Sequence, residues 1–209
     1  RCDRRGQIAQ AVNALRRNAD GSLEGALFDG EGFVKALDRF EVSVAGRRVL
    51  IVGTGGAGMA IAVSLAERGA AAIALFDPEN SRSAAAAARI NAAFAGQPAR
   101  TAKTADAAGF DLVVQASPLG MEPGDPLPLD PASVEPGAVV VDILMKNQPT
   151  PLLRACAERG ARVHPGFEML TQQIPDYLRF FGLPLPDRDR AADVDGVGMS
   201  MPSAPACGR

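Results

Sequence analysis

The residues best suited to chemistry form a glycine-rich loop in the first third of the chain. The loop consists of Gly53, Thr54, Gly55, Gly56, Ala57 and Gly58, and it fits the pattern G-x-G-x-x-G. In this pattern the first glycine permits a tight turn, the second lets a pyrophosphate approach the backbone, and the third lets a helix pack closely on a strand. The apolar run VLIV precedes the loop and an alanine-rich stretch follows it. Because the amides at a helix N-terminus attract anions, the loop predicts a dinucleotide-binding site.

An acidic residue follows the next apolar run at the distance that a ribose-binding carboxylate needs. Asp77 lies 19 residues after Gly58, close to the ~20 residues expected in such folds. A carboxylate accepts hydrogen bonds from a ribose 2′-hydroxyl and repels a 2′-phosphate, so Asp77 favours NAD over NADP. Two alternatives stay open: Arg82 could pair with a 2′-phosphate, and Asp77 could be a turn residue before Pro78 or a helix cap. The pattern GxxxxGK[ST] is absent, which gives an ATPase no support.

Oxidation of an alcohol by hydride transfer also needs a group that takes the hydroxyl proton, and the chain offers few. His164 ends a predicted strand, but a lone histidine is more often a solvated loop residue. Tyr177 lies in an apolar helical stripe typical of a core, whereas Lys146 follows a predicted strand near the cofactor crevice. Gln173 lies among apolar residues, where an amide needs a hydrogen-bonding partner in the protein or the substrate. Asn13 follows a short apolar run, where a turn residue is the simpler interpretation.

An alternation of short strands and longer helices must position these residues. Apolar runs rich in Val, Ile, Leu and Ala predict buried strands over 47–52, 72–77, 111–116, 138–143 and 161–164, with a further short strand around 100–101. Helices are predicted over 56–68, 81–94 and 150–159. Such an alternation is typical of βαβ units. We therefore predict an α/β fold with a doubly wound parallel sheet, which is a Rossmann-type NAD(P)-binding domain.

The residues before this alternation form a lead-in rather than a full domain. A turn is predicted at 18–22, in the sequence NADGS. Asp29 is then predicted to cap a helix with apolar residues on one face, namely Phe33, Leu37 and Phe40. We assign residues 1–44 to this lead-in and residues 45–165 to the dinucleotide-binding domain.

The C-terminal part of the chain contains one helix and a tail. Residues 166–182 predict a helix, which Pro175 breaks or kinks unless it lies in the first turn. The residues predicted to face inward are Leu170, Ile174, Tyr177, Leu178 and Phe181. Residues 183–209 lack periodicity and are rich in Pro, Asp and Gly, so we expect a disordered tail there.

Charge, cysteine content and hydropathy exclude several function classes. The 22 basic and 24 acidic residues give a net charge of −2, so no strong field attracts nucleic acid or an anionic membrane. The apolar runs are shorter than the ~18 residues that a membrane span needs. Three widely separated cysteines without CxxC spacing predict neither a disulfide framework nor a metal site. We therefore expect a cytoplasmic protein that binds a small molecule.

Six ordered segments of the chain resemble motifs of the shikimate/quinate dehydrogenase family. QAVNAL resembles GAVNT, LFDGEGF resembles NTDGxGF, and the glycine loop resembles GxGGAxxA. VVQASPLGM resembles VNATPxGM, and DILMKNQPTPLL resembles DxxYxPxxTPLL. Finally, GFEMLTQQ matches GxxMLxxQ with all spacings kept. The match extends from about residue 11 to residue 182.

The resemblance implies a role for residues in each of these segments. It implies that Asp29 is catalytic and that Asn13 and Gln173 bind substrate. The implied cofactor-binding residues are Gly53, Thr54, Gly55, Gly56, Ala57, Asp77, Arg82, Ser117, Pro118, Ile143, Gly166 and Met169, the last two facing the nicotinamide. The family also pairs the catalytic Asp with a lysine from an N-terminal substrate domain. Residues 1–44 would then be the end of that domain and its linking helix, a remnant of the junction between the two.

The chain departs from the family pattern at several positions near the implied site. Leu27 and Phe28 replace the Asn-Thr pair that precedes the catalytic Asp. Met145 replaces a Tyr, and Ala14 replaces a Thr. Twelve residues precede Asn13 and none of them is lysine. A paralogue that acts on an altered polyol or ring acid therefore stays open beside shikimate and quinate as substrates.

We predict an NAD(P)-dependent oxidoreductase that oxidises a ring secondary alcohol, such as shikimate or quinate, to the ketone. NAD is favoured because Asp77 stands where NADP-using members often carry Asn-Arg-Thr. One alternative is a non-catalytic NAD-binding module, or an inactive paralogue without the lysine-bearing lobe; binding would survive the loss of that lysine and turnover would not. Another is a related Rossmann enzyme acting on a folate or an aldehyde. The resemblance leaves a homodimer open.

Overall fold

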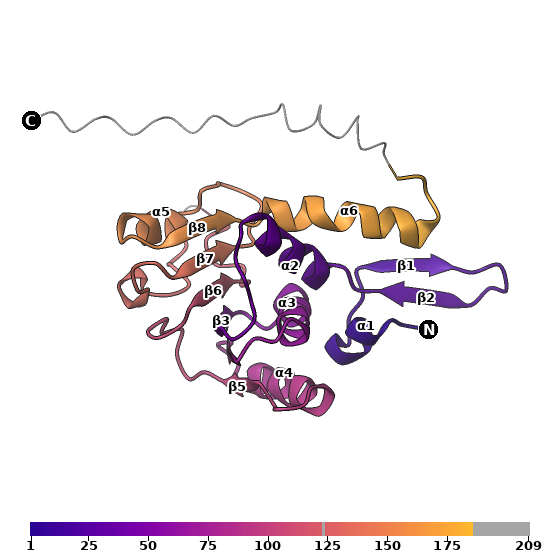
Figure 1. Cartoon of the computed structure of the whole chain (residues 1–209), viewed down its shortest axis with the longest axis horizontal. Coiled ribbons are helices and arrows are strands. Elements are labelled where there is room, and N and C mark those ends of the chain that lie inside the picture. Colours follow the sequence, from indigo (N-terminus) through magenta and orange to yellow (C-terminus); the bar gives the residue numbers. More distant parts are fainter. Residues whose placement is uncertain (123, 186–209) are drawn as a thin grey trace, which may run out of the picture.

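The structure is built on one parallel β-sheet with helices on both faces (Figure 1). The computed structural model describes residues 1–122 and 124–185. The six strands are β3 (Arg48–Val52), β4 (Ala72–Phe76), β5 (Ala99–Thr101), β6 (Leu112–Gln115), β7 (Val139–Asp142) and β8 (Arg162–Pro165). They lie in the order β5–β4–β3–β6–β7–β8. From β3 the chain adds β4 and β5 on one side and then returns to add β6, β7 and β8 on the other side, so the switch point lies between β3 and β6. Doubly wound sheets bind ligands at the carboxyl ends of the strands at such a switch point.

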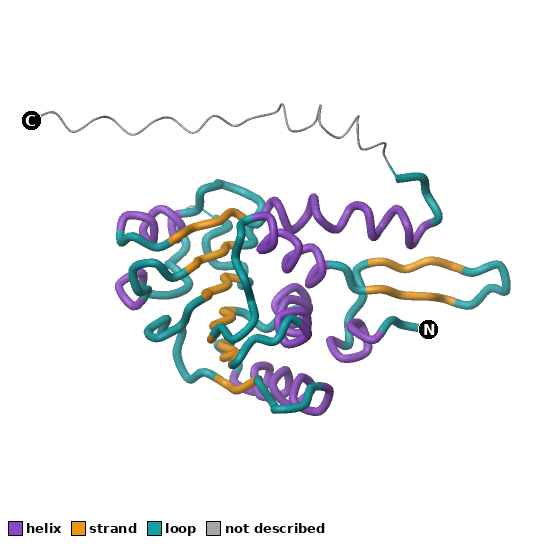
Figure 2. The backbone as a smooth tube through the Cα atoms, viewed as in Figure 1, coloured by secondary structure: helices purple, strands orange, loops and turns teal. Residues whose placement is uncertain are grey.

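Different helices cover the two faces of the sheet (Figure 2). The first face carries α2 (Asp29–Arg39), α3 (Gly56–Glu67) and α4 (Asn80–Ala93), with α1 (Arg4–Ala9) against α3 and α4. The second face carries α5 (Pro151–Glu158) and the short 3-10 helix η1 (Pro131–Ser133). The last helix, α6 (Phe167–Phe181), packs along α2.

The central strands β4, β3, β6 and β7 are mostly apolar because both of their faces are buried. In β3, Val49 and Ile51 belong to the core beneath α3, whereas Leu50 and Val52 belong to the core beneath α5. Successive side chains of a strand point to opposite faces, so a strand between two layers needs apolar residues at every position. Helix α3 is likewise buried along Gly58–Leu65, which explains why it is rich in alanine.

A small antiparallel hairpin precedes α2 and projects away from the sheet, below the end of α6 (Figure 1). It pairs β1 (Ala14–Arg17) with β2 (Leu23–Ala26), and Ala14 lies opposite Ala26. Arg16 ties the hairpin to α6: its guanidinium lies over the Phe180 ring, 4.7 Å from the centroid, and donates to the Phe180 carbonyl.

Helix α2 lies between α3 and α6 at backbone contact distance, and two glycines permit this. A Cβ atom on Gly30 would lie 2.1 Å from the Ala60 carbonyl oxygen of α3. A Cβ atom on Gly32 would lie 2.4 Å from the Met169 carbonyl oxygen of α6. Any larger residue would force the helices apart. These two contacts therefore fix α2 against both of its neighbours.

The predicted doubly wound parallel sheet is confirmed. Each of the predicted strands and helices of residues 45–165 is present, with ends that differ by at most one residue, and the short strand around 100–101 is β5. The turn predicted at 18–22 joins the two strands of the hairpin. The hairpin itself was not part of the prediction for residues 1–44.

The expectation about the start of α2 is wrong. Asp29 does not cap α2: it is the first helical residue, Phe28 is the N-cap residue, and no side chain caps the helix. The Asp29 carboxylate instead accepts a hydrogen bond from the Asn13 side chain. Pro175 lies inside α6, which is one helix from Phe167 to Phe181, so the helix is not broken there, and the kink stays a prediction. Packing of α6 along α2 holds both halves of the helix in place, and tertiary packing supplies most helical stability in proteins.

The predicted inward face of α6 is also wrong in part. Leu170, Ile174 and Phe181 are 43%, 47% and 45% exposed, whereas the buried residues of this helix are Met169 and Gln173. The close approach of the α2 backbone at Gly32 explains the difference, because it selects the side of α6 that can face inward. Tyr177 and Leu178 are half-buried.

The tail expected over 183–209 lies outside the described residues from residue 186 onward. Leu183 itself continues from α6 by donating its amide to the Leu178 carbonyl oxygen at 2.8 Å. Within the described ranges, no helix combines the length and the apolar composition needed to cross a bilayer. The boundaries at residues 44, 165 and 182 stay predictions.

The contact between α2 and α3 gives a stability prediction. We expect Gly30→Ala to lower the free energy of unfolding by at least ~2 kcal/mol, because a buried backbone atom blocks the added methyl group. Gly56→Ala is the matched control, since Gly56 begins α3 and a Cβ atom there would meet nothing within 4 Å. This exchange should leave the free energy of unfolding unchanged or raise it by up to about 1 kcal/mol. Urea unfolding followed by circular dichroism measures both, and equal stabilities would contradict the prediction.

Candidate active site

The glycine loop joins β3 to α3, and its glycines serve different purposes. Gly53 has φ +97°, and a Cβ atom there would lie 2.7 Å from the Ala116 carbonyl group. A Cβ atom on Gly58 would lie 2.0 Å from the Gly53 carbonyl oxygen. Nothing lies within 4 Å of such an atom on Gly55 or Gly56. The first and third glycines are therefore required by packing, whereas the middle of the loop is open at the start of α3, as the approach of a pyrophosphate requires.

Asp77 follows β4 and holds the glycine loop in place. Its Oδ2 accepts hydrogen bonds from the Thr54 amide at 3.0 Å and the Thr54 hydroxyl at 2.9 Å, and its Oδ1 accepts from the Glu79 amide at 3.1 Å. Burial raises the pKa of Asp77, but these hydrogen bonds and the Arg82 charge outweigh burial and lower it below its usual value. The carboxylate therefore stays ionised at neutral pH, although Asp77 is only 8% exposed. The sequence did not indicate this link to Thr54.

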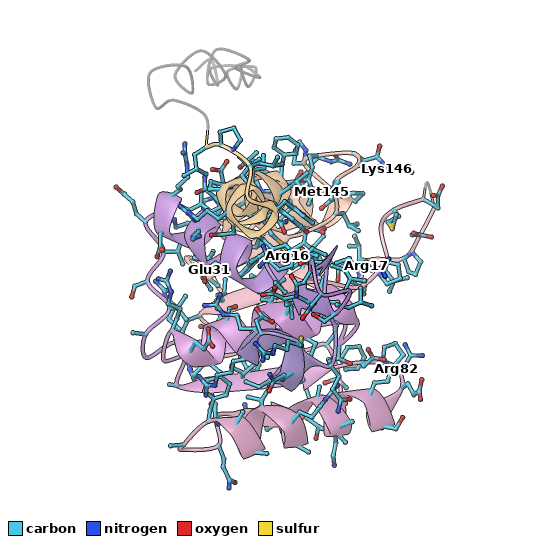
Figure 3. The ribbon with its side chains drawn as sticks, turned by 90° about the vertical axis from the view of Figure 1, so that its right-hand side faces the viewer. Arg16, Arg17, Glu31, Arg82, Met145 and Lys146 are labelled. Carbon is cyan, nitrogen blue, oxygen red and sulfur yellow. The ribbon has the colours of Figure 1, made fainter. Side chains whose placement is uncertain are left out.

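Arg82 lies in the first turn of α4, at the outer end of the same region. Its side chain is 64% exposed, and its guanidinium forms an ion pair with Glu79, with 2.7 Å between Nε and Oε2. Figure 3 shows Arg82 on the same side of the molecule as Met145 and Lys146, at opposite ends of that side.

The loops after β6, β7 and β8 meet at the other end of the sheet edge. A cavity of about 330 Å³ is lined by Ala116, Ser117, Pro118, Met121, Ile143, Leu144, Met145 and Lys146. Ser117 is held by Gln115, whose Oε1 accepts from the Ser117 amide and hydroxyl. Gly166 touches this region closely, because a Cβ atom there would lie 2.3 Å from the Ile143 Cα. Ser117, Pro118, Ile143 and Gly166 thus come together as expected, whereas Met169 is 4% exposed and packs in the core.

Asn13, Asp29 and Gln173 come from three separate elements and form one hydrogen-bonded cluster. Asn13 Nδ2 donates to Asp29 Oδ1 at 2.7 Å and lies 3.2 Å from Gln173 Oε1. Asn13 Oδ1 accepts from the Phe28 amide at 2.9 Å. Gln173 is 3% exposed, so the polar partner that its apolar surroundings required is Asn13. Asn13 does lie at a bend, directly before β1, and its side chain also connects the start of the hairpin to α2 and α6.

Tyr177 belongs to the same cluster and not to the apolar core that was expected. Its hydroxyl donates to the Asn13 carbonyl oxygen at 3.4 Å. Its ring meets Phe28 edge-on, with 5.1 Å between centroids. Burial and the nearby Asp29 charge raise the pKa of the phenol. The position of Tyr177 one helical turn after Gln173 was the sequence signal that could have placed it here.

The two alternative proton carriers lie in other surroundings. His164 stacks on Phe40, with 4.1 Å between ring centroids, so the prediction of a solvated loop residue is wrong. Burial and the Arg162 charge lower the pKa of His164, which makes the neutral imidazole the prevailing form at pH 7. Lys146 is exposed at the rim of the cavity that contains Pro118.

Comparison with known proteins identifies the family. A family model described as an FAD binding domain matches residues 48–124, the segment that contains β3, the glycine loop and β4. The shikimate dehydrogenase (NADP(+)) of Acidiphilium cryptum (strain JF-5) is 38% identical over 204 residues, which cover 93% of this chain and 72% of the relative. The chain belongs to the shikimate dehydrogenase family. The predicted resemblance is thereby confirmed.

Solved structures of the same fold agree with this membership. Quinate dehydrogenase from Corynebacterium glutamicum in complex with NAD has a TM-score of 0.80 at 28% identity, covering 92% of this chain and 70% of that one. The ligand-free 5-ketofructose reductase of Gluconobacter sp. strain CHM43 has a TM-score of 0.76 at 28% identity, covering 94% and 72%. The chain spans 72%, 62% and 57% of the length of three curated shikimate dehydrogenases.

The cluster around Asn13 gives a second stability prediction. Asn13→Ala leaves Gln173 Oε1 and the Phe28 amide without their partner, and an unsatisfied buried group costs ~1–3 kcal/mol. We expect a loss of that size in urea unfolding. Asn18→Ala is the control, because its side-chain bond to Ser22 is exposed in the hairpin turn, and we expect a change within about 0.5 kcal/mol. Equal effects of the two exchanges would show that the cluster contributes no stability.

Proposed function

We propose that this chain is the cofactor-binding part of a dehydrogenase that oxidises a ring secondary alcohol, such as shikimate, quinate or a related hydroxy acid, to the ketone. The observation that supports this most is the Asn13–Asp29–Gln173 cluster, which α2 holds against the helix of the glycine loop. Three residues from distant parts of the sequence converge with hydrogen bonds of 2.7 Å and 3.2 Å. The names of related proteins, shikimate dehydrogenase and quinate dehydrogenase, agree with this substrate class.

In the proposed reaction, Asp29 orients the substrate hydroxyl and handles its proton. Asn13 holds the Asp29 carboxylate through Oδ1, which leaves Oδ2 for the substrate hydroxyl. Gln173 would bind the substrate through its amide nitrogen, because its oxygen already lies against Asn13. When bound, a nicotinamide dinucleotide supplies the hydride acceptor, with Gly55 and Gly56 at its pyrophosphate and Ser117, Pro118, Ile143 and Gly166 at its nicotinamide end.

We further propose that NAD binds more tightly than NADP. Asp77 supports this, because an ionised carboxylate near the adenosine ribose accepts hydroxyl hydrogen bonds and repels a 2′-phosphate. Asp77 Oδ1 receives only the Glu79 amide among the hydrogen bonds of the described residues, so one of its lone pairs is free for a ribose hydroxyl. The quinate dehydrogenase structure contains NAD, whereas the curated relatives carry NADP(+) in their names.

The proposed function predicts that the chain binds NAD but oxidises shikimate or quinate only slowly. We expect calorimetric titration of the 209-residue chain with NAD to saturate, because the glycine loop, Asp77 and the cavity beside Ser117 all lie within it. None of the ion pairs in the described ranges joins a lysine to Asp29, and general acid–base assistance contributes ~10²–10⁴-fold. Reduction of NAD by shikimate or quinate should therefore be at least about 10²-fold slower than in a relative that has the family's lysine.

The matched variant for this prediction is Asp29→Asn, which should keep NAD binding and remove residual turnover. Rapid turnover by the unmodified chain would mean that Lys146 or His164 carries the proton. A chain that shows no saturable binding at millimolar NAD would contradict the proposed function itself.

The proposed cofactor preference predicts the effect of Asp77→Asn. We expect the parent chain to bind NAD about tenfold more tightly than NADP, and the exchange to narrow this gap by improving NADP. Thr54→Val is the control, because it removes a hydrogen bond to Asp77 and keeps the charge; it should change both affinities alike. Calorimetry with the two cofactors provides the measurement, and a parent that binds NADP more tightly would show that Arg82 prevails over Asp77.

A further inference from the structure

Glu79 occupies the position from which it can control the cation nearest the proposed adenosine site. It lies between β4 and α4, directly before the first residue of that helix. Its backbone amide donates to Asp77 Oδ1 at 3.1 Å, and Pro78 precedes it. The hydrogen bond of its amide and the preceding proline therefore restrict the backbone conformation of Glu79, independently of its side-chain contacts.

Both carboxylate oxygens of Glu79 have partners in the first turn of α4. Oε1 accepts from the Ser81 hydroxyl at 2.8 Å, and Oε2 lies 2.7 Å from Arg82 Nε. The side chains of Glu79 and Arg82 are 59% and 64% exposed, so the pair lies on the surface. The contacts place the carboxylate on the Nε edge of the guanidinium, which is part of the edge that an arginine uses to bind a phosphate with two parallel hydrogen bonds.

This geometry changes what Arg82 can offer to a ligand. An arginine without an acidic partner would attract a 2′-phosphate at this position after β4. Here a 2′-phosphate could use the Nε edge only by displacing Glu79, and on the other edge it would meet a guanidinium whose charge Glu79 already neutralises. In both positions the negative charges of Asp77 and Glu79 would oppose the phosphate. The formal charge of these three side chains is −1.

We propose that Glu79 is a cofactor-specificity residue, which weakens the binding of a 2′-phosphate by keeping Arg82 occupied. The proposal rests on the proposed dinucleotide function, and it adds a second acidic residue to Asp77. The two act differently: Asp77 is buried and holds the glycine loop, whereas Glu79 acts from the surface through Arg82. Removal of Glu79 should therefore affect specificity and leave the loop intact.

The test uses the 209-residue chain and four probes: NAD, NADP, adenosine 5′-monophosphate and adenosine 2′,5′-bisphosphate. In Glu79→Gln we expect calorimetry to show NADP and the bisphosphate binding about three- to tenfold more tightly, a size typical of one exposed charge pair. The affinities for NAD and the monophosphate should change less than about twofold. The gain should shrink at high salt, because exposed charges are screened.

A double-mutant cycle separates the ion pair from the charge of Glu79 alone. Arg82→Ala should cost the parent chain little NADP affinity and should cancel the gain in Glu79→Gln. Glu158→Gln is the matched control, since it removes the same charge from an exposed side chain of α5, which lies on the other face of the sheet from α4 (Figure 1). This exchange should change the affinity for none of the four probes.

Three results would overturn the proposal. If Glu79→Gln binds NAD as the parent does and gains nothing for NADP, Glu79 does not control Arg82. If Glu79→Gln loses more than about fivefold of its NAD affinity, Glu79 binds the ribose directly. If no variant binds either dinucleotide, the proposed function fails and this inference fails with it.

Discussion

The close contact of α2 with α3 determines where the candidate catalytic residue lies relative to the cofactor loop. Asp29 begins α2, and the next residue, Gly30, lies against the Ala60 carbonyl of the helix that starts at the glycine loop. Two residues later, Gly32 lies against the α6 backbone at Met169, one turn before Gln173. Asp29, Gln173 and the loop therefore share one rigid frame. A proton-handling group must be held to within a fraction of an ångström of its partner, and backbone contacts do this better than side chains.

The two ends of the sheet edge differ in chemistry, and the difference suits the proposed ligand. Near β4 the surface carries Asp77, Glu79 and Arg82 linked by hydrogen bonds and an ion pair. Near β7 the cavity wall is largely apolar, with Pro118 and Ile143. Charged groups discriminate between ligands by repulsion as well as attraction, whereas an apolar wall excludes water from a nicotinamide ring. Residues near β4 can therefore change the choice of cofactor without changing the residues near β7, where hydride transfer would take place.

The fold was predictable because its signals are local. Strands buried on both faces, such as Arg48–Val52, need an unbroken apolar run, and the glycine spacing reports a strand-to-helix turn directly. The errors arose where distant segments decide. Leu170 and Ile174 fit an inward stripe by periodicity, but the approach of Gly32 selects the Met169–Gln173 side of α6. Tyr177 suggested a core residue, and the bend at Asn13 gave no sign of its contacts with Asp29 and Gln173, since no local pattern shows that the hairpin and α6 meet.

The placement of Tyr177 also makes the candidate site optically distinct. The chain contains one tyrosine and no tryptophan, and that tyrosine contacts Asn13 and Phe28 beside Asp29. Near-ultraviolet fluorescence of the unmodified protein therefore originates almost wholly from this cluster. Binding of a ligand at Asn13, Asp29 and Gln173 or loosening of α6 would each change the emission of a single chromophore, without any label attached to the protein.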